Sequence, residues 1–195
     1  MRKQILDEII DAKALLKHPF YQAWNMGTLT VEDLGVYATQ YGEFIDRVAD
    51  GWETVGDPAI AAEERYHSLL WTDFATALDA PRPAKNRLPE IESLVNLANE
   101  CFRSRPQALG ALYAFEQQQP STSQSKLDGL RTHYSIASYG EVYFDVHKSD
   151  DAEPRWLALQ METLPDEEFA VAKDACARMA SALWVGLDGV MNEIS

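Results

Sequence analysis

The sequence predicts an all-α protein, with seven to nine helices forming one compact bundle in a single domain over residues 1–195. Apolar residues recur every three or four positions along most of the chain, and few segments alternate with the period of two that a half-buried strand requires. Prolines separate the periodic segments. Since 46% of the 195 residues are apolar, the chain can fill one sizeable core, and a second full domain is not expected.

The N-terminal half contains three predicted helices. Residues 2–16 repeat Ile, Ala and Leu on one face, and this helix ends near His18, because the residue before a proline is disfavoured in a helix. Thr30 can cap a second helix over 31–55, with acidic residues in its first turn. The third helix covers 57–78 and is ended by a proline-rich stretch.

The C-terminal half is divided mainly by prolines, which suit the first turn of a helix and interrupt its interior. The predicted helices are residues 89–104, 106–119, 121–132, 139–148, 154–163 and 165–193. The chain shows no internal repeat, and its many aromatic residues at helical intervals are predicted to fill the core.

The charge balance excludes several classes of function. Seventeen basic and 31 acidic residues give a net charge of -14, which repels nucleic-acid phosphates and anionic membrane surfaces. The start of the chain has an amphipathic period rather than the continuous apolar run of an export signal, and no stretch has the roughly 20 apolar residues of a membrane span. We therefore expect a soluble, cytoplasmic protein without a nucleic-acid or membrane partner.

Common catalytic motifs are also missing from the sequence. It contains no Gly-rich phosphate loop, no G-x-S-x-G turn and no HExxH. The two cysteines, Cys101 and Cys176, lie in helical patterns without histidine spacing, so they are predicted to be buried, reduced thiols.

Two of the four histidines lie beside carboxylates at spacings that one helical face can present. Glu64 and His67 are three residues apart, and His147 and Asp151 are four apart. Nitrogen and oxygen ligands without a thiolate suit iron or manganese. Each pair alone is also compatible with a solvated or locally hydrogen-bonded pair, so the spacing leaves both interpretations open.

Glu116 ends an apolar run, where burial of its charge requires compensation. In a helical bundle of carboxylates and histidines, a metal ion often supplies it. An ion pair with Arg47 or Arg131 is the alternative.

Six segments spread over most of the chain are distinctive. They are His-Pro-Phe-Tyr-Gln-Ala-Trp at 18–24, Gly-Thr-Leu at 27–29, the segment from His67 to Leu78, the segment from Gly110 to Pro120, Lys-Leu-Asp-Gly-Leu at 126–130 and the segment from Tyr143 to Asp151. Together they resemble the TenA/PqqC group of the haem-oxygenase-like superfamily. Within this group the chain is most similar to the di-metal oxidases of the CADD-like branch, which form para-aminobenzoate for folate synthesis. The resemblance thus implies a haem-oxygenase-like fold.

The resemblance also implies a metal centre of two iron ions, or iron with manganese, that activates dioxygen. Its implied ligands are Glu116, His67, His147, Asp151 and either Glu63 or Glu64. Glu64 is preferred, because a spacing of three residues directs it alongside His67.

One expected ligand is missing. The family pattern H-x-x-x-D-x-x-H requires a histidine at 154, where this chain has Pro154. The remaining ligands could hold one metal, or two with water at the open position, or they could be the remains of a lost site. His133 is a conceivable substitute, although its spacing does not favour it.

In the para-aminobenzoate branch, the resemblance implies that a tyrosine of the protein itself is oxidised and cleaved, with a lysine as amino donor. The matching residues are Tyr21 and Lys126. Without the resemblance, they would be interpreted as a packed aromatic residue and an exposed helix lysine.

Two other functions remain open from the sequence. The chain could be a metal-free TenA- or PqqC-like enzyme that acts on a small heterocycle, although neither cysteine lies where a TenA-type hydrolase would need one. It could also be a non-catalytic binding or interaction relative with a degenerate metal site. A homodimer is expected in any of these cases.

Overall fold

A computed structural model of the chain describes residues 1–149 and 151–194, and in these residues all regular secondary structure is helical. The helices are α1 (Arg2–Asp11), α2 (Pro19–Met26), α3 (Val31–Ile45), α4 (Val48–Val55), α5 (Pro58–Ala77), α6 (Pro89–Cys101), α7 (Arg105–Glu116), α8 (Gln119–His133), α9 (Val142–His147), α10 (Ala152–Glu162) and α11 (Asp166–Glu193), with 3₁₀ turns at Leu15–Lys17 and Ser138–Glu141. The all-α prediction is confirmed. Among the described residues, eight helices have ten or more residues, as predicted, and three shorter ones lie between them.

The prediction of one helix over 31–55 is wrong in one respect, because the helix is divided into α3 and α4. Its start is as predicted, since the Thr30 hydroxyl accepts a hydrogen bond from the Asp33 backbone N–H at 3.1 Å. The division falls at Asp46, whose carboxylate accepts hydrogen bonds from Ser68 and Arg82. No proline or glycine stands at positions 46 and 47, so the sequence does not mark the division.

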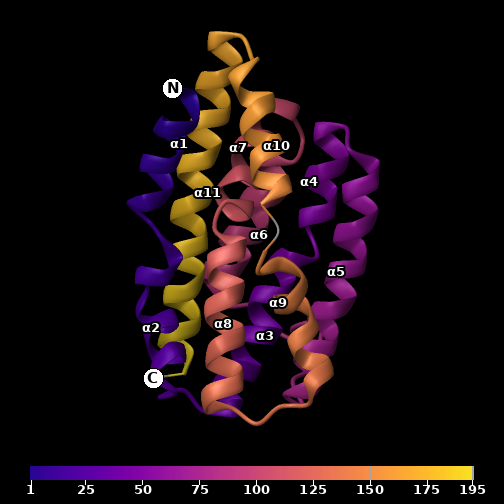
Figure 1. Ribbon diagram of the computed structural model, residues 1–195, viewed down its shortest axis with the longest axis vertical. Helices are drawn as coiled ribbons and strands as arrows, with labels where there is room; N and C mark the ends of the chain where they lie inside the picture. The colour runs from indigo at the N-terminus through magenta and orange to yellow at the C-terminus, as the bar shows by residue number, and fades with distance from the viewer. Residues whose placement is uncertain (150, 195) are drawn as a thin grey trace.

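The long helix α11 organises the packing of the bundle. Figure 1 shows it in yellow, running along most of the length of the molecule. It packs closely on α7 at Gly110, where a Cβ atom would lie 1.8 Å from the carbonyl oxygen of Ala172. Only glycine fits this close approach, which fixes the position of α7 and therefore of Glu116 at its C-terminal end.

The centre of the bundle is filled with aromatic side chains, as predicted. The Trp71 ring lies 5.5 Å from the Tyr37 ring and 4.8 Å from the Tyr143 ring, while Phe74 and Phe144 are 4.9 Å apart, measured between ring centroids. All five side chains are at most 1% exposed. This cluster joins α3, α5 and α9 into one rigid wall beside the candidate site.

Among the described helices, none is long and apolar enough to cross a membrane. Both cysteines are buried and neither forms a disulfide within the described part of the chain. Burial raises the pKa of Cys101 to about 11 and that of Cys176 to about 12, so both thiols are protonated at neutral pH. These are the inert, reduced thiols that the sequence predicts.

Candidate metal centre and adjacent tyrosine pocket

Helix α5 places the first two candidate ligands. It begins after Asp57, whose carboxylate accepts a hydrogen bond from the Ile60 N–H at 3.1 Å, with Pro58 in the first turn. Glu64 and His67 then project inward from one face, and they are 2% and 5% exposed. Glu63 lies on the exposed face, so the structure brings Glu64, not Glu63, to the cluster.

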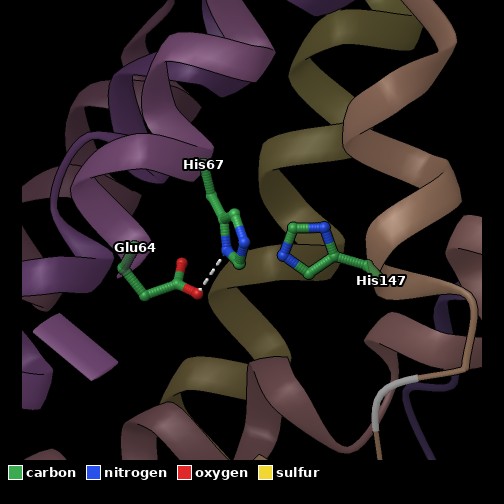
Figure 2. Close-up of side chains that lie close together, drawn as sticks. All are labelled: Glu64, His67 and His147. Carbon is green, nitrogen blue, oxygen red and sulfur yellow. Dashed lines mark hydrogen bonds and ion pairs between the residues drawn. The ribbon is translucent and has the colours of Figure 1, made fainter. Parts of the chain in front are cut away.

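His147 completes a three-residue cluster from a separate helix, α9. Figure 2 shows Glu64 and His67 projecting toward His147, whose ring centroid lies 4.3 Å from that of His67. Nδ1 of His67 is 2.8 Å from Oε1 of Glu64. Each of the three residues offers a ligand atom, and these atoms all lie within 4.8 Å of one another. A metal ion could therefore contact all three side chains after small adjustments.

The tautomer and the charge of the His147 imidazole are those that a metal ligand requires. Its Nδ1 lies 2.6 Å from the carbonyl oxygen of Tyr143, and because a carbonyl can only accept, Nδ1 carries the hydrogen. Burial, reinforced by the nearby His67, lowers the pKa of His147 to about 3, so the ring is neutral. Nε2 thus carries a lone pair, and this buried atom has no hydrogen-bond partner among the described residues.

Glu116 adds a further buried carboxylate. It is 1% exposed, and one of its oxygens, Oε1, accepts a hydrogen bond from the indole N–H of Trp52 at 3.3 Å. Burial, followed by the charges of Glu153 and Glu64, raises its pKa well above the usual value. Neither Arg47 nor Arg131 forms an ion pair with Glu116 within the described structure, so its charge requires a proton or a metal ion as compensation.

The structure does not bring Asp151 to this cluster. Its side chain is 70% exposed and forms an ion pair with Arg155 at the surface. The spacing argument assumes one continuous helix, whereas α9 ends at His147 and α10 begins at Ala152. Its ligand role therefore stays a prediction without support from this geometry.

The missing histidine is not replaced by His133. This residue is exposed, and its Nε2 lies 3.0 Å from the carbonyl oxygen of Asn25. Pro154 is buried in the first turn of α10.

Sequence reasoning missed Glu153, which precedes Pro154. It is 6% exposed and shares a hydrogen bond with the Glu116 carboxyl group. The only available signal was a carboxylate next to the position of the absent histidine. Acidic residues are common in the first turn of any helix, so this signal was weak.

Lys126 and Tyr21 meet in a buried pocket, although α8 and α2 are far apart in sequence. Nζ of Lys126 donates a hydrogen bond to the Tyr37 hydroxyl at 3.2 Å and lies 5.4 Å from the centroid of the Tyr21 ring. The hydroxyl of Tyr21 is hydrogen-bonded to Tyr37 and Thr122. Thus Lys126 is not an exposed helix lysine, since it is only 2% exposed.

Burial sets the protonation of both groups. It lowers the pKa of Lys126 to about 7 and raises the pKa of Tyr21 to about 12. At neutral pH a large share of Lys126 is therefore the neutral, nucleophilic amine, while the Tyr21 hydroxyl keeps its proton.

A small cavity lies beside Tyr21 and Lys126. It has about 230 Å³ of space between atoms, too narrow for a water molecule, and is lined by Tyr21, Lys126 and Tyr143 among others. The Tyr143 ring lies 4.2 Å from the His147 ring between centroids. Tyr143 therefore lines the cavity beside Tyr21 and also packs on a residue of the metal cluster.

The sequence matches a known family over most of the bundle. Residues 52–186 match the haem-oxygenase-like family described as iron-containing redox enzymes. The chain belongs to this family, as the resemblance predicted. Its fold is shared with a haem-oxygenase-like domain from Shewanella denitrificans (TM-score 0.81, 18% identity, 98% and 90% of the two chains covered) and with a CADD-like protein from Nostoc punctiforme (TM-score 0.67, 15% identity, 99% and 95% covered).

Relatives with a higher sequence identity to this chain are named as 4-aminobenzoate synthases. A 4-aminobenzoate synthase from Nitrosomonas europaea is 33% identical, with 96% of this chain and 90% of the relative covered. A 4-aminobenzoate synthase from Chlamydia pneumoniae is 26% identical, with 76% and 75% covered.

Proposed function

We propose that this protein is a non-haem di-metal oxidase that forms para-aminobenzoate from its own Tyr21, with Lys126 as the amino donor. The family description and the names of the relatives support the redox chemistry and the product. The arrangement of Tyr21 and Lys126 supports the internal substrate.

The observation that carries the proposal is the close approach of Lys126 to Tyr21 in the core, where Nζ lies 5.4 Å from the centroid of the Tyr21 ring. The cavity that these two side chains line has no room for a water molecule, so it does not accommodate a separate aromatic substrate. The same observation disfavours a metal-free enzyme acting on a bound heterocycle.

The residues that would hold the metals are Glu64, His67, Glu116 and His147. They fit a metal because they bury two carboxylates beside an imidazole nitrogen that has no partner among the described residues. Iron, or iron with manganese, suits this donor set, and when bound it supplies the activation of dioxygen, the co-substrate. We propose these ions as the cofactors.

The chain's own residues position the reacting groups. The hydroxyl of Tyr21 is held by Tyr37 and Thr122, and the neutral amine of Lys126 lies beside the ring. In the product, nitrogen replaces the phenolic oxygen, and Cβ of the tyrosine, oxidised at the expense of dioxygen, becomes the carboxyl carbon. The Cα–Cβ bond of Tyr21 must therefore break, and the packed aromatic surroundings exclude water from the reacting ring.

Tyr21→Phe is expected to abolish product formation, since the ring then lacks the oxygen-bearing carbon that accepts nitrogen. The measurement is para-aminobenzoate released by purified protein supplied with iron, manganese, a reductant and dioxygen. Wild type is expected to release at most one product molecule per chain. Tyr134→Phe, a half-buried tyrosine outside the cavity, is the matched control and should keep wild-type yield.

Product from Tyr21→Phe, or many turnovers by wild type, would show that the substrate is not Tyr21. The homodimer and the cytoplasmic location remain predictions.

A further inference from the structure

Glu153 lies in the first turn of α10, and its side chain is directed into the bundle. A carboxylate in the first turn of a helix is normally stabilised at the surface by the helix dipole and water. Asp151, two residues earlier, behaves in this way and is 70% exposed. Glu153 is only 6% exposed, and its carboxyl group is hydrogen-bonded to that of Glu116. Two buried carboxyl groups in contact require a shared proton or a cation.

The inward direction of Glu153 follows from the packing of α10. Trp156, one helical turn later, packs on Trp52 with ring centroids 5.6 Å apart. Trp52 in turn donates its indole hydrogen bond to Glu116. Because residues three apart share a helix face, the contact between the two tryptophans brings Glu153 to the Glu116 carboxylate.

We propose that Glu153 is a ligand of the metal centre, in place of both Asp151 and the histidine that the family pattern expects at 154. The inference rests on the proposed function only in taking the cluster to bind metal. It gives a set of three carboxylates, Glu64, Glu116 and Glu153, with two histidines.

The charge of the buried carboxylates supports this set of ligands. Three buried carboxylates nearly balance two divalent ions, whereas without a cation they repel one another in a poorly solvated site. Independently, His147 directs its Nε2 into the same cluster, and this buried atom lacks a hydrogen-bond partner in the described part of the chain (Figure 2). The outward position of Asp151 leaves Glu153 as the carboxylate that α10 supplies.

The test compares Glu153→Gln with Asp151→Asn. Metal-free protein is titrated without oxygen with Fe(II) and separately with Mn(II), and both affinity and ions bound per chain are measured by calorimetry and elemental analysis. We expect Glu153→Gln to bind at least one of its ions more than about 100-fold more weakly, because loss of a residue that only supports a ligand typically costs about 10- to 100-fold. Asp151→Asn should bind like wild type.

Each alternative outcome has its own meaning. Wild-type binding by Glu153→Gln, with loss in Asp151→Asn, would overturn the inference and restore Asp151 as the ligand. Absence of metal from wild type would instead refute the proposed function.

Thermal unfolding of the metal-free variants is the fold control. Glu153→Gln should be at least as stable as wild type because it removes one of two buried carboxylates in contact, and its unfolding would also contradict the inference.

Discussion

Lys126→Met is expected to abolish para-aminobenzoate formation and to make the metal-free protein more stable at pH 6. The lost activity follows from removal of the amine that lies 5.4 Å from the centroid of the Tyr21 ring. The added stability follows from burial, which lowers the pKa of Lys126 from 10.5 to about 7. A pKa difference of this size corresponds to at most about 5 kcal/mol, and the hydrogen bond to Tyr37 offsets part of it.

The stability difference should depend on pH in a defined direction. Between about pH 7 and pH 10.5, the unfolded chain binds a proton at Lys126 that the folded protein does not. The stability of wild type therefore rises with pH across this window, whereas methionine has no such dependence. Below pH 7 the folded lysine is also protonated, so the full cost of burying the charge is present.

Chemical unfolding of both proteins at pH 6 and pH 9 measures this effect. The advantage of Lys126→Met should shrink from a few kcal/mol toward zero. Lys173→Met, at an exposed position of α11, is the control and should show no such change. A Lys126→Met protein that is less stable than wild type at pH 6 would contradict a net cost of burying the Lys126 charge.

Glu116→Gln is expected to remove most bound metal while raising the stability of the metal-free protein at pH 8. The amide keeps the size of the side chain and its ability to accept the Trp52 hydrogen bond, but it lacks the charge that binds a cation. Burial and the neighbouring carboxylates raise the pKa of Glu116. The folded protein therefore holds a proton that the unfolded chain has lost above about pH 4.5, and wild-type stability falls as pH rises from there.

Elemental analysis and thermal unfolding measure the two effects on the same samples. Wild type should carry close to two ions per chain, and Glu116→Gln fewer than one. Glu63→Gln is the matched control, because Glu63 is exposed one residue from the buried Glu64. Retention of both ions by Glu116→Gln would exclude Glu116 as a ligand.

The sequence predicts those features that depend on local spacing. Prolines mark most helix ends correctly, and Glu64 with His67 share a face because α5 is continuous. The same argument fails for His147 and Asp151, since a helix end lies between them. No proline or glycine stands at the end of α9, so the sequence does not indicate that the helix ends between these two residues.

Features that depend on contacts between distant helices could not be derived from spacing. Tyr21 and Lys126 come together from α2 and α8, and only the resemblance linked them before the structure. Glu153 and Glu116 meet from α10 and α7, because Trp156 of α10 packs on Trp52 of α4, and Trp52 also donates a hydrogen bond to Glu116. Burial of polar groups is set by such contacts, which explains why it was the least predictable property of the site.

The central claim, that Tyr21 is the substrate, is tested most directly by isotope labelling. Protein is produced with ring-labelled tyrosine, purified, and supplied with iron, manganese, a reductant and dioxygen in buffer without any aromatic compound. We predict para-aminobenzoate with a labelled ring, together with loss of the side-chain ring from the peptide that contains Tyr21, in equal amounts. Unlabelled product, or labelled product with an intact Tyr21 peptide, would contradict the claim.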